Sequence, residues 1–206
     1  MQPVIRVVML PVLLAFMVGC KAVPQKPQAV EIDPATQITE PSPGKALIYF
    51  MRTSNYGWMM PSPVYDNDKY IGSIAMEIGV SGFVAKKKTH IAYETDPGKH
   101  MFTVYSENVD FLPAELAAGK TYYVQVRPVM GIWKIRFYLT PQQGQLPQNE
   151  LDNVIAQAGQ LKATEDGRQW AAANMADYQK TKAEWWEKYQ ARPAGERLEL
   201  RPEHGR

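Results

Sequence analysis

The sequence predicts a mainly β fold: an antiparallel β-sandwich of about seven or eight short strands, followed by a C-terminal α-helical extension. Between residues 45 and 140, short apolar or alternating segments are separated by turn residues at near-regular spacing, which is typical of sandwiches. Sixteen prolines and an aromatic content of 11% also favour a β-rich domain with structured turns. After Pro141 the apolar residues recur with helical spacing, so the chain is expected to change class there.

Residues 1–19 are predicted to form a signal peptide. Residues 7–18 are an uncharged apolar run of about 12 residues, shorter than the roughly 20 that a bilayer span requires. The run ends in Met17-Val18-Gly19-Cys20, which resembles the lipobox of bacterial lipoproteins. Cys20 is the only cysteine, and a leftover thiol in an exported protein needs an explanation, which acylation supplies. The alternative is an ordinary signal peptide with a chance cysteine.

Residues 20–44 are predicted to be the lipidated cysteine and a proline-rich tether. An extended segment of this kind rises about 3.1 Å per residue, so roughly 24 residues could reach about 70 Å. Aspartate after the lipidated cysteine commonly retains such lipoproteins in the inner membrane. Lys21 stands there instead, which favours the outer membrane, facing the periplasm. The alternative for part of this segment is a strand near residues 30–32 that packs on the domain.

The β-sandwich domain is predicted at residues 45–140. Its first strand, residues 46–51, is apolar at every position, as expected of a strand buried on both faces. A hairpin is expected around Asp66-Asn67-Asp68, and Pro97-Gly98 predicts a second tight turn. Other strands are expected at residues 79–86, 91–94, 100–105, 111–116, 122–127 and 133–139. The last two alternate strictly between apolar and polar residues, so one face of each should be buried.

The C-terminal helices are predicted at residues 147–192. Residues 149–161 carry apolar side chains on one side, and residues 165–191 carry a seam with steps of four and three. The seam residues are Ala171, Met175, Tyr178, Lys182, Trp185 and Tyr189. This seam either docks on the sandwich or is offered to a partner. The charged tail, residues 193–206, is expected to be disordered.

Three segments together resemble a bacterial lipoprotein family known as domain of unknown function 2846. They are residues 44–52 (GKALIYFMR), 96–100 (DPGKH) and 118–124 (AGKTYYV). The turn at Pro97-Gly98 also resembles that of PEGA-type β-sandwich domains. The resemblance covers about residues 44–140 and departs from the family pattern at residues 75–90, where the family has a short hairpin. It implies a small β-sandwich on a lipid tether, and it implies no activity.

No catalytic residue, metal site or cofactor is predicted. The single cysteine is used by the lipid, and the sequence holds no Gly-x-Ser-x-Gly elbow and no paired-histidine spacing for zinc. His100 falls beside a turn on the same strand face as Phe102, where a structural role at the core rim is expected. Paired carboxylates cannot be nominated from the sequence. A net charge of +2 argues against a nucleic-acid partner.

Two groups of aromatic and methionine side chains are candidate partner contacts, in a loop and in the long helix. They are Tyr56, Trp58, Met59, Trp185, Trp186 and Tyr189. Packing within the domain is the alternative for both groups. We therefore expect a non-enzymatic periplasmic module that is held to the membrane by its lipid and binds another envelope protein. Alternatives are a small-ligand or envelope-polymer binding protein, an enzyme with a site of scattered carboxylates and tyrosines, or an accessory lipoprotein of a secretion or assembly machine.

Overall fold

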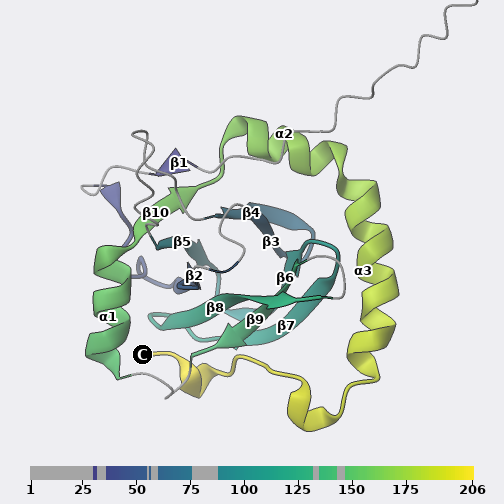
Figure 1. The fold of residues 1–206 in the computed structure, drawn as a ribbon. Coiled ribbons are helices and arrows are strands. Elements are labelled where there is room, and N and C mark those ends of the chain that lie inside the picture. Colours follow the sequence, from purple (N-terminus) through teal and green to yellow (C-terminus); the bar gives the residue numbers. More distant parts are fainter. Residues whose placement is uncertain are drawn as a thin grey trace, which may run out of the picture.

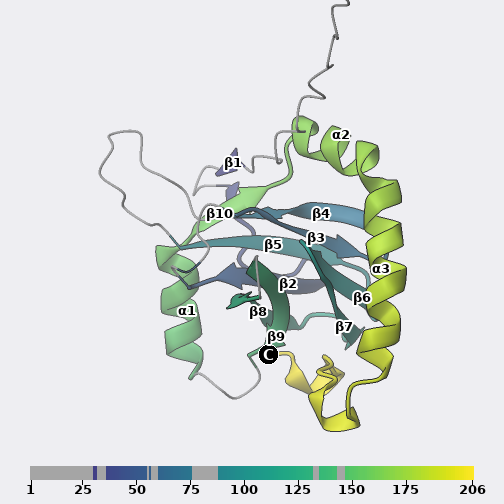
Figure 2. The same ribbon diagram turned by 45° about the vertical axis from the view of Figure 1, so that its right-hand side comes forward.

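The computed structural model describes residues 30–31, 36–54, 56, 60–75, 88–131, 135–142 and 147–206. These form four layers: a helix, a six-stranded sheet, a four-stranded sheet and a pair of helices (Figures 1 and 2). The prediction of a mainly β sandwich with C-terminal helices is confirmed. The signal peptide, Cys20, Trp58, Met59 and the strand expected at residues 79–86 lie outside the described residues.

The first sheet has six strands in the order β1-β10-β5-β2-β8-β9. Its strands are β1 (Val30–Glu31), β2 (Ala46–Arg52), β5 (Thr89–Thr95), β8 (Thr121–Met130), β9 (Ile135–Pro141) and β10 (Gly159–Lys162). Two pairs are parallel, β2 with β8 and β10 with β5, so this sheet is mixed where an antiparallel one was expected. Parallel neighbours need a crossover, and between β2 and β8 the chain builds the whole second sheet.

The second sheet has four antiparallel strands in the order β4-β3-β6-β7. They are β3 (Ser62–Asp66), β4 (Lys69–Ile74), β6 (Gly98–Tyr105) and β7 (Val109–Leu116). The predicted hairpin around residues 66–68 joins β3 to β4, and Asn67 there has a φ of 53°. Asparagine tolerates this left-handed conformation better than most residues, which explains why the turn forms at this position.

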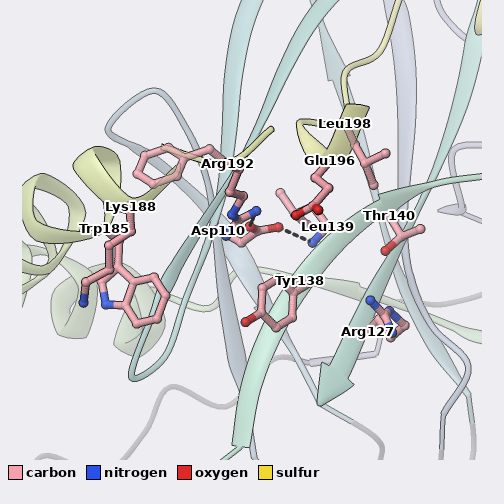
Figure 3. Close-up of a pocket in the computed structure, with 11 residues that line it drawn as sticks. Asp110, Arg127, Tyr138, Leu139, Thr140, Trp185, Lys188, Arg192, Glu196 and Leu198 are labelled. Carbon is pink, nitrogen blue, oxygen red and sulfur yellow. Dashed lines mark hydrogen bonds and ion pairs between the residues drawn. The ribbon is translucent and has the colours of Figure 1, made fainter. Parts of the chain in front are cut away.

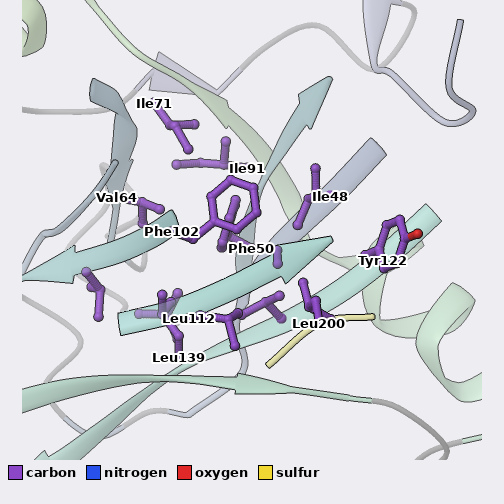
Figure 4. Close-up of a cluster of buried hydrophobic side chains, with 14 of the residues drawn as sticks. Ile48, Phe50, Val64, Ile71, Ile91, Phe102, Leu112, Tyr122, Leu139 and Leu200 are labelled. Atoms are coloured by element: carbon purple, nitrogen blue, oxygen red, sulfur yellow. The ribbon is translucent and has the colours of Figure 1, made fainter. Parts of the chain in front are cut away.

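The main hydrophobic core lies between the two sheets (Figure 4). Alternate residues of each strand point inward, so Ile48 and Phe50 of β2 meet Phe102 of β6 and Leu112 of β7. The rings of Phe50 and Phe102 pack edge to face, with their centroids 5.2 Å apart. This contact joins the centres of the two sheets.

The outer face of the six-stranded sheet is covered by α1 (Gln148–Gln157). Leu151 of this helix is 1% exposed and packs with Leu47, Tyr49 and Met51. These three side chains alternate with the inward-facing ones of β2, so all seven residues of the strand are buried. The expectation of a strand buried on both faces is confirmed.

The outer face of the four-stranded sheet is covered by α2 (Glu165–Ala173) and α3 (Met175–Gln190). Tyr178 of α3 is fully buried and stacks on Tyr65, with centroids 4.1 Å apart. Its hydroxyl lies 2.8 Å from the hydroxyl of Thr103, and burial raises the pKa of Tyr178 to about 12. At the exposed side, the Lys182 ammonium pairs with Asp68 at 2.7 Å. Of the two alternatives for the helical seam, the structure therefore shows docking on the sandwich.

The helices differ from the predicted ranges at two points. The long helix is broken at Asn174, whose side-chain amide donates to the carbonyl of Trp170 and separates α2 from α3. The first helix ends at Gln157, and residues 159–162 form β10 instead of continuing it. The Gly159 amide donates to the carbonyl of Lys88, so pairing beside β5 takes precedence over the helical pattern.

Side chains at the start of β7 and just before it join the two sheets along the edge of β9. The Asn108 side chain donates to the carbonyl of Phe137 at 2.9 Å and accepts from its amide at 3.1 Å. The Asp110 carboxylate accepts from the amide of Leu139 at 2.9 Å. These side chains take the place of a neighbouring strand, so buried backbone groups of β9 are satisfied.

The predicted disorder of residues 193–206 is wrong, because this segment packs across one end of the sandwich. It holds two short 3₁₀ turns, Ala194–Glu196 and Pro202–His204. Leu200 is 2% exposed in the main core, and its backbone bonds to Pro113 and Glu115 of β7. Arg206 exchanges two backbone hydrogen bonds with Thr121 of β8. The segment thus ties both sheets together, because its backbone bonds to β7 in one sheet and to β8 in the other. The side chain of Leu200, although its neighbours are charged, fills the end of the core.

Part of the predicted tether also lies on the domain. Val30–Glu31 form β1 and pair with β10, as the alternative for this segment proposed. The carbonyl of Ile38 accepts a hydrogen bond from the Tyr49 hydroxyl at 2.9 Å, and the Ser42 amide donates to the carboxylate of Glu94. The predicted tether, residues 20–44, is therefore not a free spacer over its whole length, because residues 30–31, 38 and 42 contact the domain.

We expect Gly205→Ala to destabilise the fold, because a Cβ at this position would lie 2.6 Å from the ring of the buried Tyr122. Overpacking of this kind costs about 1–3 kcal/mol, which urea unfolding would measure. Gly195→Ala is the matched control in the same segment, since a Cβ there meets nothing within 4 Å. Equal stability of the two variants would contradict the packing of residues 193–206 on the sandwich.

Candidate functional site

A hollow of about 390 Å³ lies where the end of α3 and the segment after it meet β7 and the β8–β9 hairpin (Figure 3). We call it the basic hollow because three cationic side chains line it: Arg127, Lys188 and Arg192. The other residues that line it include Asp110, Tyr138, Thr140, Trp185, Glu196 and Leu198.

The pairing of β8 with β9 positions the residues that form the floor of the basic hollow. Arg127 lies directly opposite Tyr138 in the register, so both side chains point to the outer face of the sheet. Their neighbours Val126 and Leu139 point the other way, into the main core. Helix α1 packs on apolar side chains from β2, β5 and the start of β8, which leaves the outer face of this hairpin to the hollow.

Aromatic rings hold several cations at or beside the hollow. The Lys188 ammonium lies 4.3 Å from the ring centre of Trp185, and the Arg136 guanidinium lies 5.2 Å from the same ring. The Arg192 guanidinium lies 5.3 Å from the ring of Tyr189 and also approaches Tyr138. Such contacts are worth about 0.5–1 kcal/mol at exposed sites, which is enough to bias these flexible side chains toward one position.

Two carboxyl groups line the basic hollow, those of Asp110 and Glu196. Asp110 is 3% exposed, and its two oxygens accept from the amide of Leu139 and from Arg192, each at 2.9 Å. Burial raises the pKa of Asp110, against the lowering effect of these hydrogen bonds. Because both oxygens are engaged, this carboxylate is placed to hold Arg192 and β9 rather than to exchange protons with a ligand.

A second polar cluster surrounds His100 at the rim of the core. Its Nδ1 lies 2.9 Å from the Asp66 carboxylate, which also accepts from the Tyr93 hydroxyl at 3.0 Å. Its Nε2 lies 3.0 Å from the carbonyl oxygen of Asp96, and its ring stacks on Phe102. A catalytic histidine directs one ring nitrogen at the reacting group. Both nitrogens here face groups of the fold, which agrees with the structural role expected from the sequence.

A third polar cluster surrounds Arg52, which is fully buried at the end of β2. Its guanidinium donates to the carbonyl of Met60 at 2.6 Å and to that of Ile74 at 3.3 Å. It also lies 4.7 Å from the ring centre of Phe137 and donates to the carbonyl of Tyr56. Burial lowers the pKa of Arg52 to about 10. This side chain therefore joins Tyr56 and Met60, which follow β2, to residues of both sheets.

The six predicted contact residues do not form one surface in the described structure. Tyr56 is 40% exposed, and its hydroxyl donates to the sulfur of Met130, which is 68% exposed. Trp185 lines the basic hollow, whereas Tyr189 is 4% exposed and Trp186 packs on Phe111. Trp58, Met59 and the lipidation residue Cys20 lie outside the described residues, so their predicted roles stay predictions.

Of the residues that line the basic hollow, sequence reasoning named only Trp185 as a candidate contact. It missed all the charged ones: Asp110, Arg127, Lys188, Arg192 and Glu196. The only available signal was the strict alternation of residues 122–127 and 133–139, which places Arg127 and Tyr138 on polar strand faces. Nothing local to Arg192 marks it, because its partner Asp110 lies far away in the sequence and the two meet only in the fold.

Comparisons with protein-family models and with curated proteins found no match to this chain. The resemblance to domain of unknown function 2846 therefore stays a prediction. Over the described residues, no cluster of three or more His, Cys, Asp or Glu side chains is arranged to hold a metal ion. In the same part of the chain, no helix has the length and apolar character needed to cross a membrane.

We expect Arg52→Ala to lower the free energy of unfolding by about 3 kcal/mol, because buried carbonyl groups lose their donors. Urea unfolding would measure this loss. The control is Arg127→Ala, an exposed arginine whose replacement should change stability by less than about 0.5 kcal/mol. A similarly small effect for Arg52→Ala would show that the guanidinium does not hold the loop to the sheets.

Proposed function

We propose that this chain is a lipid-anchored, non-enzymatic module of the bacterial cell envelope that acts by binding another envelope protein. The signal-like N-terminus and Cys20 support the anchor, and Lys21 supports an outer-membrane location facing the periplasm. Two or more acyl chains, as on a mature lipoprotein cysteine, hold a protein firmly to a bilayer. The sandwich is then presented to partners near the membrane.

The non-enzymatic proposal rests on one observation: the side chains that could act as a general acid or base are hydrogen-bonded to other groups of the protein. Both ring nitrogens of His100 face Asp66 and a backbone carbonyl, and both oxygens of Asp110 are hydrogen-bonded. The Tyr178 hydroxyl is buried between Thr103 and the backbone of Asn67. A general acid or base must present a free atom to its substrate. These groups stabilise the fold instead, which favours binding over catalysis.

The loop after β2 offers the partner surface that this proposal requires. Tyr56 and Met130 are exposed and touch each other, so they present a joined apolar surface from two elements distant in sequence. Arg52 donates hydrogen bonds to the backbone carbonyl groups of Tyr56 and Met60 in this segment. Exposed aromatic side chains are typical anchors of protein interfaces.

The basic hollow favours a second candidate function, that of a small-ligand or envelope-polymer binding protein. It combines cationic side chains with aromatic rings in a concave surface, which is a common arrangement in ligand sites. An accessory role in a secretion or assembly machine is a form of the first function, in which the partner belongs to that machine.

The anchor is tested by labelling cells with palmitate, which we expect to enter the wild-type chain and not Cys20→Ser. The binding surface is tested by recovering partners of the detergent-extracted full chain. Tyr56→Ala and Trp58→Ala should each weaken partner recovery by about 30-fold, the effect of losing roughly 2 kcal/mol at an interface anchor. Ile38→Ala is the control, since Ile38 is also an exposed apolar residue but lies before β2.

Label in the Cys20→Ser variant would contradict the anchor. Recovery of the same partners by wild type, Tyr56→Ala and Trp58→Ala would contradict the assignment of the loop. The two results are separable, because the first depends on the lipid and the second on the folded domain.

A further inference from the structure

We propose that the basic hollow, together with Arg136 beside it, binds an extended acidic segment of a partner protein. This inference rests on the proposed protein-binding function and adds a charged contact to the apolar surface of Tyr56 and Met130. It assigns the hollow to the first candidate function rather than the second, because of how the charges of the hollow are distributed. It does not depend on the lipid at Cys20.

Three cations at or beside the hollow have no anionic partner in the part of the chain that the structure describes. The charged groups of Arg127, Arg136 and Lys188 make no hydrogen bond or ion pair with the described residues. The fourth cation, Arg192, pairs with Asp110 at 2.9 Å. Among the residues that line the hollow, the one remaining acid is Glu196. Three cations against this one carboxylate leave an excess of two positive charges, which favours an acidic partner.

These three cations lie in two separate groups. Lys188 and Arg136 both lie against the ring of Trp185, at 4.3 Å and 5.2 Å from its centre. Figure 3 shows this ring at one end of the hollow and Arg127 at the other, with Arg192 between them. Groups that are set apart in this way do not converge on one compact anion. They suit an extended chain that carries carboxylates at intervals along its length.

The group at Trp185 places two like charges beside one ring. Contacts with the aromatic face bias the Lys188 ammonium and the Arg136 guanidinium toward these positions, although the two cations repel each other. A carboxylate bound beside them would offset this repulsion. Guanidinium and ammonium groups both form charge-assisted hydrogen bonds with carboxylates, and a guanidinium can hold both oxygens. The end of the hollow at Trp185 is therefore suited to an acidic side chain.

The rest of the lining favours a protein segment over a uniformly charged polymer. Glu196 also lines the hollow and would repel a polymer that carries a negative charge on every unit. A protein segment can place an uncharged residue near this carboxylate and acidic residues on either side. Leu198, which is 43% exposed, and the ring of Tyr138 offer apolar surface to such a residue. Arginine and aromatic side chains are also enriched in protein interfaces.

Fluorescence anisotropy of labelled peptides, titrated with the full chain in detergent, tests the site. The probe repeats the sequence Asp-Leu-Ser, and a repeat of Asn-Leu-Ser is the uncharged control peptide. We expect the acidic peptide to bind, and to bind more weakly as salt is added, while the control peptide binds about tenfold more weakly. Because the probe is a repeat, it can find its own register along the hollow.

Arg127→Gln and Lys188→Ala should each weaken binding of the acidic peptide about threefold, which is the size expected of one exposed ion pair. The double variant should weaken it about tenfold, because the two side chains contact different ends of the same peptide. Lys180→Ala is the matched control and should bind like the wild type, because Lys180 is an exposed lysine of α3 that does not line the hollow.

Failure of the acidic peptide to bind, or equal binding of the two peptides, would overturn the proposal. An unchanged affinity in either Arg127→Gln or Lys188→Ala would overturn it as well, since the occupant would then not reach both ends. Polygalacturonate, an anionic polysaccharide, is the probe for the second candidate function. If it bound more tightly than the peptide and lost affinity in the same variants, the hollow would be a polymer site instead.

The loop surface is separated from the hollow by a further variant. Tyr56→Ala should bind the acidic peptide like the wild type, because Tyr56 does not line the hollow. Loss of peptide binding with intact recovery of partners through Tyr56 would overturn only this inference. Peptide binding without any recovered partner would overturn only the assignment of the loop.

Discussion

The constraint on which the structure depends is that both sheets are apolar on both faces. In β2, Ile48 and Phe50 point into the main core while Leu47, Tyr49 and Met51 point outward. In the second sheet, Tyr65 and Phe111 point outward in the same way. Exposing these rings and methyl groups to water would cost about 25 cal/mol for each Å² of apolar surface. The helices are therefore needed to complete the fold, and a four-layer arrangement follows.

Closing the sandwich requires polar contacts as well as apolar ones. The buried edge of β9 has backbone groups that do not pair with the backbone of β7. The side chains of Asn108 and Asp110 form hydrogen bonds with these groups instead. Residues 193–206 close one end through Leu200 and through backbone bonds to both sheets. The basic hollow lies beside these contacts, where Arg192 joins the helix side of the molecule to Asp110. Part of its wall is therefore held by the same contacts that close the sandwich.

The sequence predicted those elements whose pattern is set by local burial. Alternation identified β8 and β9, an unbroken apolar run identified β2, and helical spacing identified α1 and α3. Residues 159–161 are predicted to be helical, because Leu161 continues the helical pattern of residues 149–161. Their strand conformation comes from a free edge beside β5, which is a property of the assembled sheet. Leu200 is similar: its charged neighbours predict disorder, and its burial depends on the open end of a sandwich that other segments build.

The candidate site was less predictable than the fold for the same reason. Trp185 was identified as an aromatic residue on a helix, but Tyr189, named with it, is buried inside the molecule. Arg127 and Lys188 line one hollow only because the fold brings the β8–β9 hairpin near the end of α3, and nothing in either local sequence refers to the other. Tyr56, a loop residue that is 40% exposed, was named as a candidate from its residue type alone. A charged hollow between elements distant in sequence needs the tertiary structure.

The most direct test of the four-layer account is native-state amide hydrogen exchange of the full chain, comparing α3 with β6. Tyr178 joins them through its ring and its bond to Thr103, so the account predicts that their core amides exchange with the same free energy, that of global unfolding. Rapid exchange around Tyr178 while the amides of β6 stay protected would show that the helix leaves the sheet independently. That result would contradict the claim that the sandwich requires its helical layers.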